Sequence, residues 1–268
     1  MHPQFASFGS TIWFLASVVG FVYIIGPILI KFTQKSPAKM TFERFDPSTL
    51  SPEVSPFFLH TIQWMTSQGF TLIDYLVRPN AQPNVTPCAV WLVNHATGDT
   101  AVIACFFVNQ NGVMSIKNSY YYYTARFDDT TTVSTTSMAY DGPSSFKSRP
   151  DCPGFRLPTL PDPASVYTVH RFAVEKYAAG KTRTRIPPGQ EMAAFDKSNT
   201  ESYVNQEKMG LMKYVPARDL YIPTWYGAFY MTYSLLWPLK QMKSAEAKKK
   251  SEALLAEFER SRQTYVAR

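Results

Sequence analysis

The chain has 268 residues, of which 45% are hydrophobic, 15% aromatic and 18% charged, with a formal net charge of +7. This balance excludes an intrinsically disordered chain, which would carry more charge and fewer aromatic residues. A mean hydropathy of −0.18 excludes a polytopic membrane protein, and the length accommodates one or two folded domains.

An apolar N-terminal segment is the first element along the chain. Residues 1–30 contain no Asp, Glu, Lys or Arg, and residues 11–30 are mostly apolar. A helix of that length is about 30 Å long, which matches the hydrocarbon core of a bilayer. A cleaved signal peptide is disfavoured, since no basic residue precedes the run and no small-residue cleavage site follows it. The sequence therefore predicts an uncleaved transmembrane helix in residues 1–30.

Basic residues follow this run directly. Lys31, Lys35 and Lys39 stand just beyond it, whereas only the α-amino group is charged before it. The positive-inside rule therefore predicts a single-pass protein with a basic juxtamembrane linker over residues 31–54 and the following domain in the cytoplasm. We also expect the three lysines to meet the membrane interface and anionic lipid head groups.

Cysteine usage agrees with that orientation. Cys88, Cys105 and Cys152 are odd in number and have no short repeated spacing, so they do not form a disulfide framework. The glycosylation sequon at 84–86 points to the opposite side of the membrane, but a single sequon is common by chance.

The middle of the chain, residues 55–219, reads as a soluble α+β domain. Ser55-Pro56 opens an amphipathic helix that Gly69 closes. Five strand-like runs follow, joined by short connectors rich in turn residues, and predict an antiparallel meander of four or five strands. These runs are residues 70–77, 88–94, 100–108, 113–127 and 130–138. The last run is polar and β-branched, which suits an exposed edge.

A proline-rich stretch separates the predicted sheet from further helices. Residues 142–163 hold six prolines, which predicts a long surface loop without helix or central strand. A helix is expected from about residue 162 to Gly180. The pattern Ser198…Glu201 resembles a capping box and predicts a second helix that reaches about Met212.

A second uncharged segment covers residues 220–239. Its aromatic residues Tyr226, Tyr230, Tyr233 and Trp237 recur at helical spacing, which suits a helix at the membrane interface. A second membrane span is the first alternative, and a stripe packed in the soluble core is the second. A second span would place the two basic clusters on opposite sides of the membrane, against the positive-inside preference.

The tail over residues 240–268 has a helical composition. Leu254, Leu255 and Phe258 give it a narrow apolar face. This face would lie on a membrane or pair with a partner helix, unless the tail is only a solvated helix end.

The charge distribution indicates which partners to expect. Residues 45–239 carry equal numbers of positive and negative side chains, so the excess flanks the two hydrophobic segments. A nucleic-acid-binding protein would show its excess on the folded domain, so nucleic acid is not expected as a partner. The expected partner is the lipid bilayer, and the candidate protein partners are another membrane protein or a second copy of the chain.

Residues 94–99 hold the best catalytic candidates. His95 follows a predicted strand, and with Asp99 as an orienting carboxylate and Asn94 beside it, it could act as a general base. The same residues also suit a plain hairpin turn, which is the more economical interpretation. His170 shares a helix face with apolar residues and reads as a core histidine. The sequence has no metal-binding, phosphate-binding or dinucleotide-binding motif, so no metal and no cofactor is expected.

A run of tyrosines in the fourth predicted strand gives one further surface. Alternate side chains of a strand face opposite sides, so Tyr121 and Tyr123 would share a face that could contact a ligand or partner. Aromatic residues that fill a sheet surface under a loop are the alternative.

Three functions follow from these features. The first is a single-pass membrane-anchored protein whose cytoplasmic domain is a noncatalytic interaction or scaffold module. The second is a membrane-associated domain that binds a lipid or another apolar ligand, which requires a large apolar pocket near Tyr226. The third is a membrane-bound enzyme that uses His95 and Asp99, which requires these two side chains within hydrogen-bond reach.

Overall fold

The computed structural model describes residues 4–39, 42–49, 55–77, 85–110, 113–141, 146–160 and 162–266. The chain forms two compact units. Unit 1 comprises Met1–Met40, Pro143–Lys147 and Ser198–Lys243, and unit 2 comprises Thr41–Gly142, Ser148–Lys197 and Ser244–Arg268. Each unit is assembled from separate parts of the chain.

Unit 2 is built on a seven-stranded sheet with the strand order β2-β3-β4-β5-β6-β7-β8. Neighbouring strands are antiparallel except β7 and β8, which are parallel. The strands are β2 (Glu43–Arg44), β3 (Thr71–Val77), β4 (Val85–Val93), β5 (Thr100–Gln110), β6 (Val113–Arg126), β7 (Thr132–Thr136) and β8 (Gly154–Arg156). The α+β class and the meander from β3 to β7 are confirmed, and β2 and β8 extend the sheet at its two edges.

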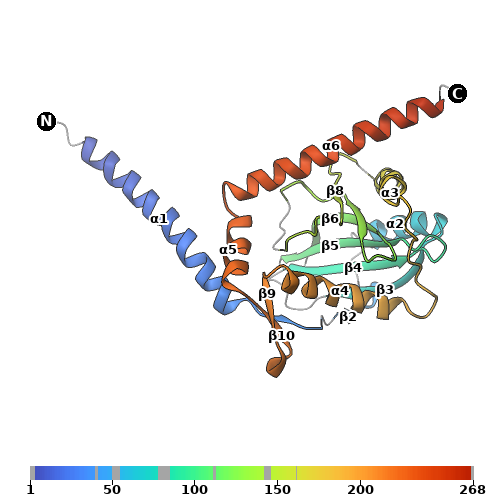
Figure 1. Cartoon of the computed structure of the whole chain (residues 1–268), viewed down its shortest axis with the longest axis horizontal. Coiled ribbons are helices and arrows are strands. Elements are labelled where there is room, and N and C mark those ends of the chain that lie inside the picture. The colour runs from blue at the N-terminus through green and yellow to red at the C-terminus, as the bar shows by residue number, and fades with distance from the viewer. Residues whose placement is uncertain are drawn as a thin grey trace. The chain divides into compact units, whose positions relative to one another are not determined.

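Apolar side chains cover both faces of this sheet. On one face α2 (Ser55–Ser67), α3 (Pro163–Tyr177) and the apolar side of α6 (Leu239–Val266) complete the main core. On the other face Trp91 and Val93 pack with Met192 and Phe195. Figure 1 shows α3 and α6 on the same side of the sheet. Burial on both faces explains why residues 88–93 of β4 and 101–106 of β5 are apolar throughout rather than alternating.

The predictions for residues 130–163 are wrong in two respects. β7 is not an exposed edge, because β8 pairs with it and Val133 and Thr135 are buried. The proline-rich stretch also contains a strand, since β8 lies between two of its prolines and its Phe155 side chain joins the core. A three-residue strand that pairs on one side only needs few backbone donors, so the prolines around it do not prevent it.

Unit 1 contains a three-stranded antiparallel sheet and two helices that pack together. The sheet has the order β1-β10-β9, with β1 (Ser36–Pro37), β9 (Met212–Val215) and β10 (Leu220–Pro223). α1 (Gln4–Thr33) lies beside α5 (Trp225–Ser234) along its C-terminal half (Figure 1). A small core of Tyr203, Met212, Tyr221 and Met231 holds the unit together.

Two helix boundaries differ from the prediction. The helix expected over 220–239 is shorter, because residues 220–223 form β10 and the Thr224 side chain caps α5 by accepting from the Gly227 amide at 2.9 Å. The capping box expected at Ser198 does not form, since α4 (Glu191–Lys208) begins seven residues earlier. The helix begins just after the Pro-Pro-Gly sequence at 187–189, so Ser198 lies in the interior of the helix. Two short 3-10 helices, Pro47–Thr49 and Pro216–Arg218, complete the described structure.

Within the described ranges, no helix combines the length and the apolar character that crossing a membrane requires. The transmembrane prediction for residues 1–30 is therefore not supported by the structure.

Candidate functional site

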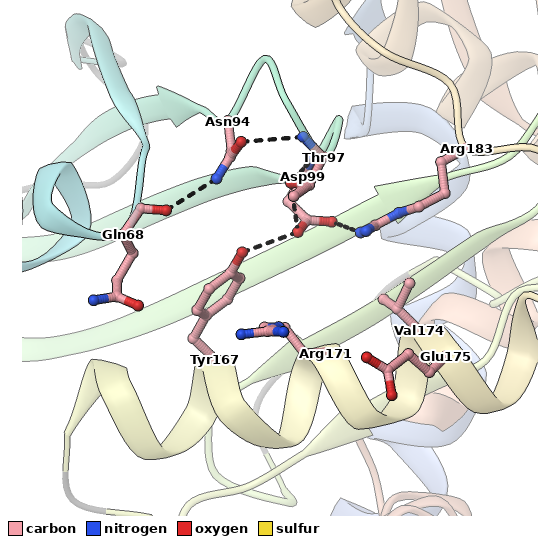
Figure 2. Close-up of a pocket in the computed structure, with 9 residues that line it drawn as sticks. All are labelled: Gln68, Asn94, Thr97, Asp99, Tyr167, Arg171, Val174, Glu175 and Arg183. Atoms are coloured by element: carbon pink, nitrogen blue, oxygen red, sulfur yellow. Dashed lines mark hydrogen bonds and ion pairs between the residues drawn. The ribbon is translucent and has the colours of Figure 1, made fainter.

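A polar cavity of about 300 Å³ lies in unit 2, between the loop that joins β4 to β5 and one face of α3. Figure 2 shows its lining side chains. They come from the end of α2, the β4–β5 loop, α3 and the segment after α3, and they are Gln68, Asn94, Thr97, Asp99, Tyr167, Arg171, Val174, Glu175 and Arg183. Two of the three catalytic candidates, Asn94 and Asp99, therefore belong to this pocket.

Asp99 is the buried anchor of the pocket. Its side chain is 0% exposed, and its Oδ2 accepts hydrogen bonds from Thr97 Oγ1 at 2.9 Å and Tyr167 OH at 3.1 Å. Arg183 Nη2 donates to Oδ1, and His170 Nε2 lies 3.7 Å from the same oxygen. Burial alone would raise the pKa of Asp99, but His170, Arg183 and Thr97 together hold it below its usual value. The carboxylate therefore stays ionised and ties three chain segments together.

The Tyr167 hydroxyl donates a hydrogen bond to this carboxylate, and the side chain stays neutral. Burial and the adjacent Asp99 charge both raise the pKa of Tyr167. Because both Asp99 oxygens already accept hydrogen bonds, Asp99 has little capacity left to act as a general base.

Asn94 shapes the loop that carries Asp99. Its Oδ1 accepts from the amides of Ala96 and Thr97, each at 3.1 Å, and its Nδ2 donates to Gln68 O at 3.1 Å. Gly98 adopts a φ of 78°, and a Cβ at this position would lie 2.3 Å from the carbonyl oxygen of Thr184. Only glycine fits this position, because the loop crosses the 184 backbone there.

His95 points to a different place. Its Nδ1 lies 2.8 Å from Ile186 O and its Nε2 lies 3.4 Å from Glu191 Oε1. It does not line the pocket, and no hydrogen bond or ion pair joins it to Asp99 among the described residues. The His95–Asp99 pair expected for an enzyme is therefore not formed, and His95 instead fastens the segment before α4.

His170 takes the place beside Asp99 that the sequence analysis gave to His95. It is fully buried, as expected of a core histidine, between the rings of Tyr123 at 5.8 Å and Tyr167 at 6.1 Å. Neither ring nitrogen has a hydrogen-bond partner among the described residues. The sequence carried one signal of this arrangement, since Tyr167, His170 and Arg171 recur at helical spacing on α3.

Two charged side chains of the lining are left without partners. Arg171 and Glu175 are exposed on α3, one helical turn apart, and no hydrogen bond or ion pair is found for either within the described structure. Arg183 contacts Asp99 only through Nη2, and its side chain is 31% exposed. The nine lining residues include no serine, cysteine or histidine. The charged and amide groups of the lining suit a polar ligand.

No group of three or more His, Cys, Asp or Glu side chains that could hold a metal ion occurs in the described residues. Asp99 itself is occupied by protein donors, so the pocket offers a metal ion no anchored set of ligands.

The tyrosine surface differs from its prediction. Tyr123 is buried, and its hydroxyl donates to Pro163 O at 3.0 Å, while Tyr121 is half-buried against Phe57. The register explains the difference, because Tyr121 and Tyr123 lie opposite core residues of β5 and therefore face α2 and α3. The more exposed ring of this run is Tyr122, at 37%.

The residues expected at a membrane interface lie in unit 1. Tyr226 and Trp237 are exposed, whereas Tyr230 and Tyr233 are half-buried. Tyr233 donates to Tyr23 O at 3.3 Å, and the Lys243 ammonium lies 4.8 Å from the Tyr230 ring centre. Lys31 donates to a backbone carbonyl at 2.7 Å, whereas Lys35 and Lys39 are exposed side chains that follow α1.

No match was found when the chain was compared with protein-family models, with curated proteins and with solved structures. The functional conclusions therefore rest on the contacts described above.

Proposed function

We propose that the protein attaches to a membrane through unit 1 and carries unit 2 as a noncatalytic binding module. The observation that carries the proposal is an exposed apolar surface formed by α1 and α5, called here the α1–α5 surface. Its members are Phe21, Ile24, Ile28 and Phe32 of α1 and Trp225 and Phe229 of α5, which are 37% to 65% exposed.

The geometry of α1 supports this proposal. Phe21, Ile24, Ile28 and Phe32 recur at helical spacing on one stripe, and Phe32 at the end of this stripe contacts Trp225 of α5. The α5-facing side of α1 packs closely, since a Cβ at Gly26 would lie 2.7 Å from Thr232 Cγ2. The exposed stripe is therefore not a disordered helix end but the outer face of a packed pair. Apolar patches of this kind mark membrane or partner contacts.

The charges beside this surface favour a lipid membrane. Phe32 meets Trp225 with ring centres 6.0 Å apart, and the Lys31 ammonium lies 6.0 Å from the same indole. Tryptophan beside lysine is typical of the boundary between the hydrocarbon core and the head groups. Lys35 and Lys39 follow at the same end of α1, so anionic head groups complete the contact.

The second candidate function, binding of an apolar ligand, has less support. Eight of the nine residues that line the cavity described above are polar or charged, and none of residues 220–239 is among them. Apolar side chains fill the three core clusters instead.

Vesicle flotation of the full chain tests membrane attachment. The protein is reconstituted from detergent into vesicles of phosphatidylcholine with phosphatidylserine, and we expect it to float with them and to resist extraction at alkaline pH. The triple variant Ile24→Asp, Ile28→Asp and Phe32→Asp should be lost from the vesicles. The control is Leu59→Asp, which changes a 53% exposed leucine of unit 2 and should float like the parent.

Equal flotation of the triple variant and the parent would contradict attachment through the α1–α5 surface. Tags at both termini and protease treatment of sealed vesicles then test the orientation. We expect unit 2 and the C-terminus to be digested together, and protection of one of them alone would contradict the predicted topology.

A further inference from the structure

The pocket of unit 2 has an unusual distribution of neutralised and free charges. The Asp99 carboxylate forms an ion pair with Arg183 and accepts hydrogen bonds from Thr97 and Tyr167, and it is 0% exposed. The negative charge of Asp99 is therefore paired within the protein and is not available to a ligand. The charges that a ligand would meet are those of Arg171, Glu175 and the free side of Arg183.

Arg171 and Arg183 are the two cationic residues of the cavity lining. Both line the cavity, from α3 and from the segment that follows it (Figure 2). Arg183 is held in place by Asp99 through Nη2, which leaves Nη1 without a partner among the described residues. Guanidinium groups bind carboxylates through paired hydrogen bonds, and a guanidinium already fixed by a buried ion pair loses little freedom when it binds.

Glu175 adds an acceptor site on the same wall. It lies four residues after Arg171, a spacing at which opposite charges commonly pair on a helix, yet the two form no ion pair here. Side chains at this spacing have Cβ atoms about 5–6 Å apart. The same wall of the cavity therefore presents one cationic and one anionic side chain, which suits a ligand that carries both charges on one carbon.

The size of the cavity agrees with a small ligand. A cavity of about 300 Å³ is at the lower end of the range for small-molecule sites. Val174 lies between Arg171 and Glu175 in the sequence and adds an apolar element to the lining, while Gln68 and Asn94 provide amide groups elsewhere in the cavity.

We propose that this pocket binds a free amino acid, with its carboxylate on Arg171 and Arg183, its ammonium on Glu175 and a polar side chain near Gln68. This proposal gives a ligand class to the binding module proposed above. It does not depend on membrane attachment, because ligand binding can be measured in detergent micelles without a bilayer.

The test is titration calorimetry of the full chain in micelles with the common amino acids as probes. Each amino acid that binds is compared with two analogues, one that lacks the ammonium and one that lacks the carboxylate. For alanine these are propionate and ethylamine. We expect at least one amino acid to bind with a dissociation constant below about 10 mM, at least about tenfold tighter than either analogue.

Variants of the two exposed side chains identify the contacts. Arg171→Gln should weaken the amino acid at least about tenfold, and Glu175→Gln should remove its advantage over the analogue without the ammonium. Both residues are exposed, so the fold should survive, as circular dichroism can verify. Arg185→Gln is the control, since Arg185 is an exposed arginine of the same segment that does not line the cavity.

Three results would overturn the proposal. The first is that no common amino acid binds, and the second is that the analogues bind as tightly as the amino acid. The third is that Arg171→Gln and Arg185→Gln have the same effect. None of these results bears on flotation, so failure of this proposal and failure of membrane attachment remain separate.

Discussion

Gly98 offers the most direct test of how the pocket is held together. It has a φ of 78°, and a Cβ there would lie 2.3 Å from the Thr184 carbonyl oxygen. Cβ atoms do not come this close to backbone oxygens, so alanine must push residues 183–185 away from the loop. Arg183 lies in that segment, so Gly98→Ala should weaken its contact with Asp99 as well.

The size of the effect can be worked out against a matched glycine. Gly180 has a φ of 76° but no heavy atom within 4 Å of its Cβ, so alanine there bears only the left-handed conformation, about 1–2 kcal/mol. At Gly98 the displaced backbone also loses the hydrogen bond from Thr184 N to Arg126 O, now 2.8 Å, and loosens the Asp99 ion pair. These losses add about 0.5–1.5 and about 1 kcal/mol. We therefore expect about 3–4 kcal/mol for Gly98→Ala.

Hydrogen exchange in increasing urea measures both variants. Amides of β4 and β5 report the unfolding of unit 2 alone, which avoids mixing in the response of unit 1. A difference of about 2 kcal/mol corresponds to roughly a thirtyfold change in the opening equilibrium. Equal losses for Gly98→Ala and Gly180→Ala would refute the close approach of the loop to residue 184.

Three further predictions concern unit 2. Because the pKa of Asp99 is lowered, its ionised form stabilises the fold above the unfolded pKa of about 3.9, and this contribution is lost as the pH falls through the folded pKa. Below about pH 4, the free energy of unfolding measured in urea should therefore fall less steeply with falling pH in Asp99→Asn than in the parent. An unchanged dependence on pH would contradict the pairing. In folded protein, Cys152 should react with iodoacetamide far faster than the buried Cys88 and Cys105, since burial raises the pKa of both to about 12; equal rates by mass spectrometry would contradict this. Leu254→Ala should destabilise unit 2 by about 2–4 kcal/mol in urea, because this α6 side chain is 1% exposed in the main core, and a loss below about 1 kcal/mol would mean that α6 does not dock there.

Local signals predicted the parts of the fold that local physics determines. Ser55-Pro56 starts α2 as expected, and Phe58, Ile62 and Met65 form its buried face. Asp162 caps α3, with its side chain accepting from the Ser165 amide at 2.8 Å. In each case the determining contact lies within a few residues along the chain, so the sequence pattern contains it.

Contacts between distant residues were not predictable in this way. Arg183 is 84 residues from Asp99 in the sequence, and no local pattern around either residue indicates the other as its partner. The tail helix was expected on a membrane, on a partner helix or in solvent, yet its Phe258 packs against Phe172 with ring centres 5.6 Å apart. The narrow apolar face of the tail was recognised, but a face alone does not say which surface covers it.

The segment after α3 shows how a weak sequence signal acquires meaning in the structure. Lys181 and Arg183 alternate in an extended stretch, and side chains two apart in an extended chain point the same way. Lys181 reaches Asp129 at 3.0 Å, and Arg183 reaches Asp99. The alternating basic residues thus hold this segment beside the sheet through ion pairs with acidic residues. The sequence alone did not show this, because it does not give the positions of the acidic partners.

The neutral charge of the middle region has the same explanation. Equal numbers of acids and bases over residues 45–239 suggested only that nucleic acid is not a partner. In unit 2 part of the balance takes the form of local pairs, such as Lys181 with Asp129 at 3.0 Å, in addition to the ion pair that Asp99 forms. Arg171 and Glu175 stand apart from this pattern, because both line a cavity and neither is paired within the described residues. Their position in the cavity is the reason why we assign them to a ligand that carries both charges.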